Sequence, residues 1–323
     1  MATSTTTHIR GRYAPSPTGD LHIGNARTAL LAWLHVRSLG GTFVMRIEDL
    51  DRPRCVAGGS AGILEDLRWL GLDWDEGPDV GGARGPYLQS ERTAIYDEAL
   101  EKLAAAGLTF DCYCSRADFA AAASAPHGPA DDGPRYPGTC RHLTDEAAAA
   151  KRAAGRKPSK RLRVEPGACS FEDGVAGRVA VDLSQSVGDF VVRRADGIHA
   201  YQLAAAVDDG LMGITHVLRG DDLLTSTPRQ LHIIEALGLR APRYAHVPLL
   251  FGPDGKRLSK RNGDTTVRWF REQGVRPERL VAELARSCGL TTEREIDARS
   301  LVASFDLAHI AREARPFDPD ALL

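Results

Sequence analysis

Two loops of this sequence carry residue types that suit the phosphate groups of a nucleotide. The first loop, 17–25, reads Pro-Thr-Gly-Asp-Leu-His-Ile-Gly-Asn. It lies between a predicted strand and a predicted helix, where free backbone N–H groups and the helix dipole favour an anion. Gly24 would let a nucleotide approach the backbone, and His22 and Asn25 could donate hydrogen bonds to phosphate or ribose oxygens. Alone, such a loop is more often an ordinary strand-to-helix turn.

The second loop, 255–261, reads Gly-Lys-Arg-Leu-Ser-Lys-Arg and concentrates cations in a short stretch. Cations around a serine could bind a triphosphate and stabilise the negative charge that develops on the leaving pyrophosphate. Lys260 is the strongest single candidate for this role. The alternative is a solvated basic loop, since charge runs usually face water.

A third group of residues suits a metal ion. Cys112, Cys114 and Cys140 lie close together in the sequence. Three thiolates in a reducing compartment suit a tetrahedral structural zinc ion, although their spacing also allows buried free thiols. Tyr136 and His142 flank the third cysteine, and either could be the fourth ligand. The other cysteines are isolated and are interpreted as small structural residues: Cys55, Cys169 and Cys288.

Alternating strand and helix patterns must position these groups. A short strand at 10–14 leads through the first loop into helical apolar spacing at 23–39. A second strand, 42–47, ends in an acidic cluster at 48–51, and helical spacing returns at 61–70. This alternation predicts an α/β domain with a parallel sheet.

The pattern breaks down between 110 and 188, which we interpret as an inserted subdomain. Strand and helix alternation resumes at 190–193, 216–219 and 227–237, so the sheet is predicted to be split by the insertion. Helix-like segments follow after residue 264. The predicted catalytic domain consists of two halves, 1–109 and 189–265. The inserted subdomain, 110–188, separates them, and a short helical tail follows at 266–323.

The composition is that of a globular protein. The chain has 323 residues, 41 Lys plus Arg against 43 Asp plus Glu, and 43% hydrophobic residues. This suggests about two domains with ample core material and excludes a wholly disordered chain. The basic run 151–163 is the one candidate surface for nucleic acid. The first eight residues lack a signal-peptide pattern and no segment is long and apolar enough to span a membrane, so we expect a cytoplasmic protein.

Four ordered motifs, at 12–30, 46–51, 220–230 and 258–261, resemble the catalytic half of the class I glutamyl-tRNA synthetases. The resemblance implies a Rossmann-like parallel sheet, split by a zinc-bearing insertion, that activates glutamate with ATP and Mg²⁺. Two departures are visible. Asn25 takes the place of the last histidine of the "HIGH" motif, and Arg257 replaces the first lysine of "KMSKS", which keeps the charge but changes its geometry.

The chemistry of glutamate agrees with that resemblance. A selective pocket needs two cationic sites for the carboxylates and one anionic site for the ammonium group. Arg12 and Arg219 supply the cations and Glu48 the anion. Read alone, Arg12 or Glu48 would more often form a surface ion pair. Once the motifs are accepted, their position at the carboxyl ends of strands favours ligand binding, because open α/β sheets bind ligands there.

The resemblance implies three sets of site residues. The glutamate pocket consists of Arg12, Ala14, Ser16, Glu48, Tyr201 and Arg219. The ATP site consists of His22, Gly24, Asn25, Arg257, Ser259 and Lys260, with His22 and Lys260 as the catalytic residues. One structural Zn²⁺ is held by Cys112, Cys114, Tyr136 and Cys140.

The sequence ends where a full glutamyl-tRNA synthetase would continue into a helical anticodon-binding region. In length and in its cysteine and tyrosine pattern it resembles the shorter glutamyl-Q tRNA(Asp) synthetases. These activate L-glutamate without RNA and transfer it to the queuosine base in the anticodon stem-loop of tRNA(Asp). The alternatives are a short synthetase that charges tRNA(Glu), a silent RNA-binding relative and a different nucleotidyltransferase. We expect a monomer.

Overall fold

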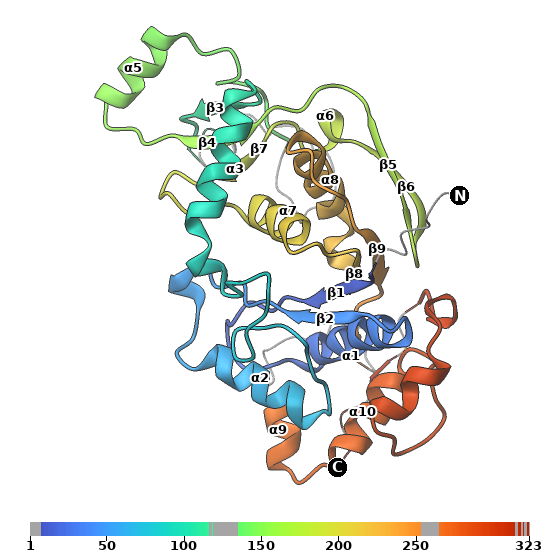
Figure 1. The fold of residues 1–323 in the computed structure, drawn as a ribbon. Coiled ribbons are helices and arrows are strands. Elements are labelled where there is room, and N and C mark those ends of the chain that lie inside the picture. Colours follow the sequence, from blue (N-terminus) through green and yellow to red (C-terminus); the bar gives the residue numbers. More distant parts are fainter. Residues whose placement is uncertain are drawn as a thin grey trace.

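A six-stranded sheet forms the centre of the computed structural model (Figure 1), which describes residues 8–115, 118, 135–252, 265–313, 316–317, 319 and 322. Its strand order is β2-β1-β8-β9-β5-β6. All neighbouring strands run parallel except β6, which is antiparallel to β5. The predicted α/β sheet is therefore confirmed, with one antiparallel edge strand. The strands are β1 Arg10–Tyr13, β2 Thr42–Met45, β5 Ala168–Asp173, β6 Gly177–Asp182, β8 His216–Gly220 and β9 Arg243–Val247.

Helices cover both faces of this sheet. Helix α1 (Ile23–Ser38) lies on one face, and α7 (Tyr201–Leu211) and α8 (Thr227–Ala236) lie on the other (Figure 1). Buried residues of α1 include Leu30, Leu31 and Leu34, each at most 1% exposed. Helix α1 is buried nearly all round because it packs between the sheet and the C-terminal helices. The first half also contains α2 (Gly59–Trp69) and α3 (Thr93–Ala105).

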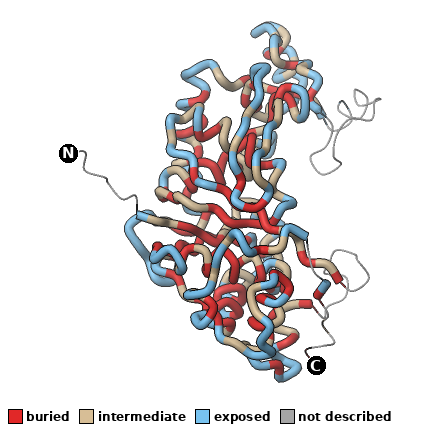
Figure 2. The backbone as a smooth tube through the Cα atoms, turned by 90° about the vertical axis from the view of Figure 1, so that its right-hand side faces the viewer, coloured by how far each residue is buried: buried red, intermediate tan, exposed pale blue. Residues whose placement is uncertain are grey.

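A second, antiparallel sheet has the order β3-β4-β7. Its strands are β3 (Thr109–Cys112), β4 (Ser159–Leu162) and β7 (Phe190–Arg193). Helix α5 (Asp145–Ala153) projects beside it, with Ala148 as its buried residue, and the top of Figure 2 is accordingly mostly exposed. The short helix α6 (Leu183–Ser186) follows β6.

The two sheets differ from the predicted division of the chain. We expected all of 110–188 to lie apart from the catalytic sheet, but the hairpin β5–β6 extends that sheet through the pairing of Asp173 with Tyr244. We also expected 190–193 to resume the catalytic sheet, whereas β7 pairs with β4. The strand at 190–193 was predicted from its residues and the hairpin β5–β6 was not, because local pattern does not specify which distant strand becomes the neighbour.

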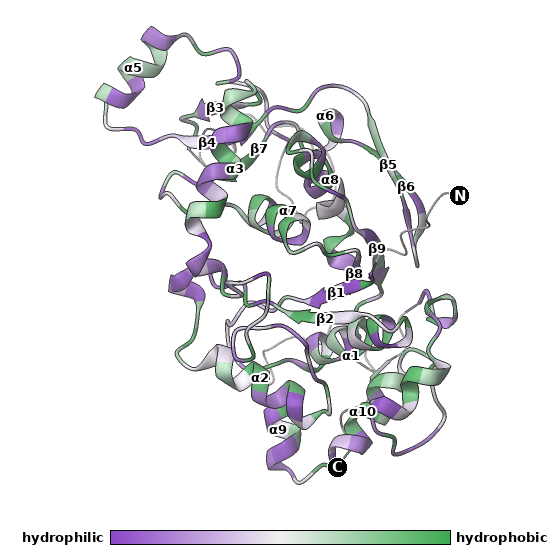
Figure 3. Ribbon diagram, in the orientation of Figure 1, coloured by the Kyte–Doolittle hydropathy of each residue, from purple (hydrophilic) through white to green (hydrophobic). Residues whose placement is uncertain are grey.

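Helical segments after residue 265 share one hydrophobic core with α1. They are α9 (Val267–Glu272), α10 (Pro277–Arg286) and the 3₁₀ segments Arg299–Ser304 and Leu307–His309. Helix α10 carries both hydrophobic and hydrophilic residues (Figure 3), and its buried residues share one core with α1. Pro277 occupies its first turn, where a missing N–H costs nothing. Further 3₁₀ segments are Arg52–Arg54, Gln89–Glu91 and Asp221–Ser226.

None of the described helices combines the length and the apolar composition needed to cross a membrane.

Candidate active site and metal centre

A cavity of about 590 Å³ opens at the carboxyl ends of β1, β8 and β9. Open α/β sheets bind ligands at this edge, because the loops that leave the strands converge there. Nine residues of the predicted glutamate and ATP sites line this one cavity: Arg12, Ala14, Ser16, His22, Gly24, Asn25, Glu48, Tyr201 and Arg219. The structure therefore brings together residues that are separated by up to two thirds of the chain.

His22 lines the cavity and occupies the N-cap of α1, within the first loop, which was predicted to bind the nucleotide. Its Nδ1 accepts a hydrogen bond from the backbone N–H of Gly24 at 3.2 Å. Its Nε2 lies 2.9 Å from the hydroxyl of Thr265. Because Nδ1 accepts, the ring proton belongs on Nε2, so Nε2 donates to Thr265. The imidazole thereby joins the first loop to the chain just before α9, and a hydrogen bond from His22 to phosphate stays a prediction.

The predicted ATP-binding residues Arg257, Ser259 and Lys260 lie outside the described residues. The chain on both sides of them borders the cavity: Leu250 lines it, and Thr265 contacts the first loop. The backbone N–H of Ile23 donates to the carbonyl of Thr265 at 3.0 Å. The described residues that flank the stretch with Lys260 therefore lie at the cavity and at the first loop, respectively.

Buried ion pairs join two of the predicted glutamate-binding residues. The Asp209 carboxylate forms ion pairs with Arg12 Nε at 3.2 Å and with Arg46 Nη1 at 2.8 Å. A second nitrogen of Arg46 lies 3.2 Å from Glu48. Burial raises the pKa of Glu48, although Arg46 and Arg12 oppose this shift. Arg12 is thus largely neutralised by Asp209, and Glu48 is oriented by Arg46.

The network continues behind Arg46. Its Nε lies 3.5 Å from Asp208, and the same carboxylate accepts hydrogen bonds from Arg92 at 2.6 Å and from Tyr96 at 2.8 Å. Sequence reasoning missed Arg46, Asp208 and Asp209. A usable signal was present, because two adjacent acids in the apolar segment of α7 are expected to be buried only if they are paired.

Arg219 is held differently from Arg12 and Arg46. Its guanidinium donates to His246 Nε2 at 3.0 Å and to the Thr227 hydroxyl at 2.8 Å, and lies 3.5 Å from the Tyr201 hydroxyl. It forms no ion pair with a carboxylate within the described residues. Arg219 therefore keeps its positive charge for an anion in the cavity, while Glu48 offers a negative charge. This arrangement suits an amino acid with an acidic side chain.

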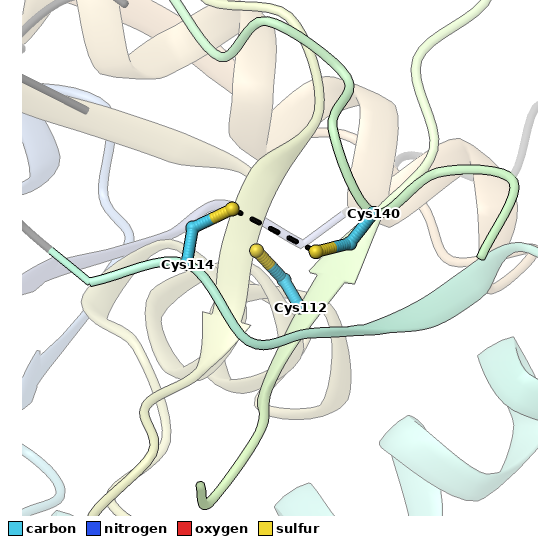
Figure 4. A group of neighbouring side chains, drawn as sticks. All are labelled: Cys112, Cys114 and Cys140. Atoms are coloured by element: carbon cyan, nitrogen blue, oxygen red, sulfur yellow. Dashed lines mark hydrogen bonds between the residues drawn. The ribbon is translucent and has the colours of Figure 1, made fainter. Parts of the chain in front are cut away.

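The three cysteines form a compact group. Their sulfur atoms all lie within 4.8 Å of one another, and those of Cys114 and Cys140 are 3.6 Å apart (Figure 4). Four ligands at zinc–sulfur distances of about 2.3 Å would place the sulfurs about 3.8 Å apart. The Tyr136 hydroxyl lies 3.5 Å from the sulfur of Cys112, whereas His142 is exposed and outside this group. The donor set fits zinc, with Tyr136 in the better position to complete it.

The basic run 151–163 is not a uniform surface. Arg161 is buried and its guanidinium lies 4.0 Å from the centre of the Tyr136 ring, and Lys160 pairs with Asp111 at 2.6 Å. Arg152 and Arg156 are about half exposed, with side-chain exposures of 51% and 50%. Part of the predicted nucleic-acid surface therefore supports the cysteine group.

Comparison with known proteins gives consistent results. Residues 8–322 match the family of class I tRNA synthetases (E and Q), catalytic domain. A protein of Symbiobacterium thermophilum named glutamyl-Q tRNA(Asp) synthetase is 54% identical over 94% of both chains. A Halorhodospira halophila protein named glutamate–tRNA ligase 1 is 49% identical over 97% of this chain and 66% of its own. The crystal structure of glutamate-tRNA synthetase from Elizabethkingia anophelis superimposes with a TM-score of 0.84 at 29% identity, covering 96% of this chain and 68% of that one.

Proposed function

Since the chain belongs to the class I tRNA synthetases of the glutamyl and glutaminyl type and is a ligase-type enzyme, we propose that it activates L-glutamate with ATP and transfers it to the queuosine base of tRNA(Asp). The observation that carries the first half of this proposal is the cavity that combines Glu48 with the unneutralised Arg219. Glu48 binds the substrate ammonium group, and Arg219 binds a carboxylate. Ser16 and Tyr201 add hydroxyl contacts.

The reaction needs two displacements. The α-carboxylate of glutamate attacks the α-phosphorus of ATP, which forms glutamyl-adenylate and releases pyrophosphate. His22, at the N-terminus of α1, and Lys260 stabilise the phosphate charges, and Mg²⁺ bound with ATP adds positive charge there. A hydroxyl of the queuosine ring then attacks the carbonyl carbon of the adenylate, and AMP leaves. The first step depends chiefly on in-line alignment of the carboxylate with the bond to pyrophosphate, and the second on holding the hydroxyl close to the face of the carbonyl group.

Two observations support queuosine-containing tRNA(Asp) as the RNA substrate. The relative at 54% identity bears the name of the queuosine-directed enzyme, and Tyr136 beside Cys112 matches the ligand pattern that this shorter family implies. The second candidate is a glutamyl-tRNA synthetase that charges tRNA(Glu), because a relative at 49% identity bears that name.

We expect glutamate-dependent ATP–pyrophosphate exchange in the absence of RNA, and transfer of labelled glutamate to queuosine-containing tRNA(Asp). The matched control is tRNA(Asp) that lacks queuosine, which should accept nothing. Transfer to the 3′ end of tRNA(Glu), with exchange that requires this RNA, would instead establish the second candidate.

We further propose that Cys112, Cys114, Cys140 and Tyr136 hold one structural zinc ion, which would join β3 to the loop before α5. Cys114→Ser is expected to lower bound zinc from about one ion per chain and to destabilise this region, because a thiolate ligand is lost. The measurement is metal analysis of the purified protein together with thermal unfolding. Tyr136→Phe should also lower zinc, whereas His142→Ala should leave it unchanged. Absence of zinc from the unsubstituted protein would overturn the proposal.

The role proposed for Glu48 predicts a pH dependence of glutamate binding. Burial raises the pKa of Glu48, and only the carboxylate form binds the ammonium group. The KM for glutamate should therefore rise as the pH falls through this raised pKa. Glu48→Gln should increase the KM by about 10- to 100-fold at neutral pH and remove this dependence. Glu172→Gln, on an exposed position of β5, is the matched control and should leave the profile unchanged. An unchanged profile for Glu48→Gln would exclude Glu48 as the ammonium ligand.

A further inference from the structure

His246 on β9 lies between Arg219 and Asp173 in the interior. Its side chain and that of Asp173 are both 0% exposed. Nδ1 of His246 is 2.6 Å from Asp173 Oδ2, and Nε2 is 3.0 Å from Arg219 Nε. The three side chains therefore form one continuous chain of hydrogen bonds from β5 to the rim of the cavity.

The partners of Asp173 keep it ionised. Burial alone would raise its pKa, but hydrogen bonds from His246 and from the backbone of Ala176 and Val175 lower it to about 2. Its Oδ1 accepts from the N–H groups of Val175 at 3.0 Å and Ala176 at 2.9 Å. An ionised carboxylate can only accept, so His246 Nδ1 must carry a proton.

The other side of the imidazole is fixed by Arg219. A guanidinium can only donate, so His246 Nε2 must be unprotonated to accept from it. The Thr227 hydroxyl lies 3.0 Å from the same nitrogen and accepts a hydrogen bond from Arg219 at 2.8 Å. His246 is thus neutral, in one tautomer, and burial lowers its pKa in agreement with this.

This support contrasts with that of the neighbouring buried arginines. Arg12, Arg46 and Arg92 each contact a buried aspartate directly. Arg219 is oriented by the buried side chains of His246 and Thr227. The carboxylate of Asp173 contacts the far side of the His246 ring and does not contact Arg219 itself. Its orientation is fixed while its charge remains available.

We propose that Asp173 and His246 are positioning residues that fix the guanidinium of Arg219 for the side-chain carboxylate of the amino-acid substrate, and so contribute to selection of an acidic amino acid. The inference rests on the proposed function. It also assigns a part in substrate selection to β5, a strand that lies in the segment expected to form a separate insertion.

The test is steady-state ATP–pyrophosphate exchange by the full chain with Asp173→Asn. An amide at this position donates to His246 Nδ1, which moves the ring proton to Nε2, where it opposes the N–H of Arg219. We expect the KM for glutamate to rise about tenfold or more, with kcat and the KM for ATP changed less than about threefold. Discrimination against glutamine should fall in parallel.

Two further variants separate positioning from a general structural effect. His246→Gln keeps an oxygen that can accept from Arg219, and His246→Met does not. The KM for glutamate should therefore rise less in His246→Gln than in His246→Met. Asp182→Asn alters another aspartate at the end of a strand, β6, which accepts a hydrogen bond from the backbone N–H of Ser184, and this variant should behave as the parent. Unchanged glutamate KM in folded Asp173→Asn and His246→Met proteins would overturn this inference alone. Absence of exchange in the parent would overturn the proposed function and this inference with it.

Discussion

Lys260→Ala is expected to reduce glutamate-dependent ATP–pyrophosphate exchange by about 100- to 1000-fold. Negative charge moves onto the departing pyrophosphate as the adenylate forms, and Lys260 is the cation of the basic loop best suited to follow it. Removal of one such group from an electrostatic site costs about 3–4 kcal/mol in the transition state. The measurement is the exchange rate at saturating ATP and glutamate.

The control for this prediction is Lys102→Ala. Lys102 is 65% exposed, pairs with Glu98 within helix α3 and does not line the cavity. This control should exchange within about twofold of the parent, and both variants should unfold near the parent's melting temperature. Full exchange activity in Lys260→Ala would show that the phosphate-holding group lies elsewhere.

Asp209→Ala is expected to lower the free energy of unfolding by about 3–5 kcal/mol. The substitution leaves Arg12 and Arg46 without their shared carboxylate in an interior where all three side chains are at most 5% exposed. Urea unfolding measures the change. Asp196→Ala is the matched control, because its ion pair with Arg194 is about half exposed and should contribute less than about 1 kcal/mol.

The same contacts predict how this contribution depends on pH. Burial alone would raise the pKa of Asp209, but Arg12 and Arg46 shift it below its ordinary value. Its stabilising contribution is therefore present above the unfolded-state pKa of about 3.9 and is lost as the pH falls below it. Equal stabilities of Asp209→Ala and the parent at neutral pH would contradict the assignment of Asp209 as the centre of the network.

Local pattern was sufficient to predict several individual elements of the catalytic sheet, whereas the strands between 110 and 188 were not predicted one by one. Helix α1 was expected at 23–39 and is observed at Ile23–Ser38, and β7 was expected and observed at 190–193. Strand neighbours could not be predicted in the same way. The hairpin β5–β6 joins β9 through residues that are far apart in the sequence, and no local spacing specifies that pairing.

The cavity-lining residues could be anticipated because motif residues at strand ends converge at one edge of the sheet. Their supporting partners could not. Asp173 and His246 belong to different strands, and Asp209 lies 197 residues from Arg12. What selects these partners is burial, since a charge removed from water needs a countercharge or a complete set of hydrogen bonds. A sequence shows the buried charge but not which distant group compensates it.

The long sequence separation of these contacts has a consequence for synthesis of the protein. Arg12 meets Asp209 across 197 residues, and His22 meets Thr265 across 243. A growing chain emerges from its N-terminus, so the first loop and its arginine must wait for most of the chain before their partners exist. Contacts of such separation also slow folding. Substrate binding should therefore appear late and in one step, and shortened translation products that end before residue 265 should have no partly working site.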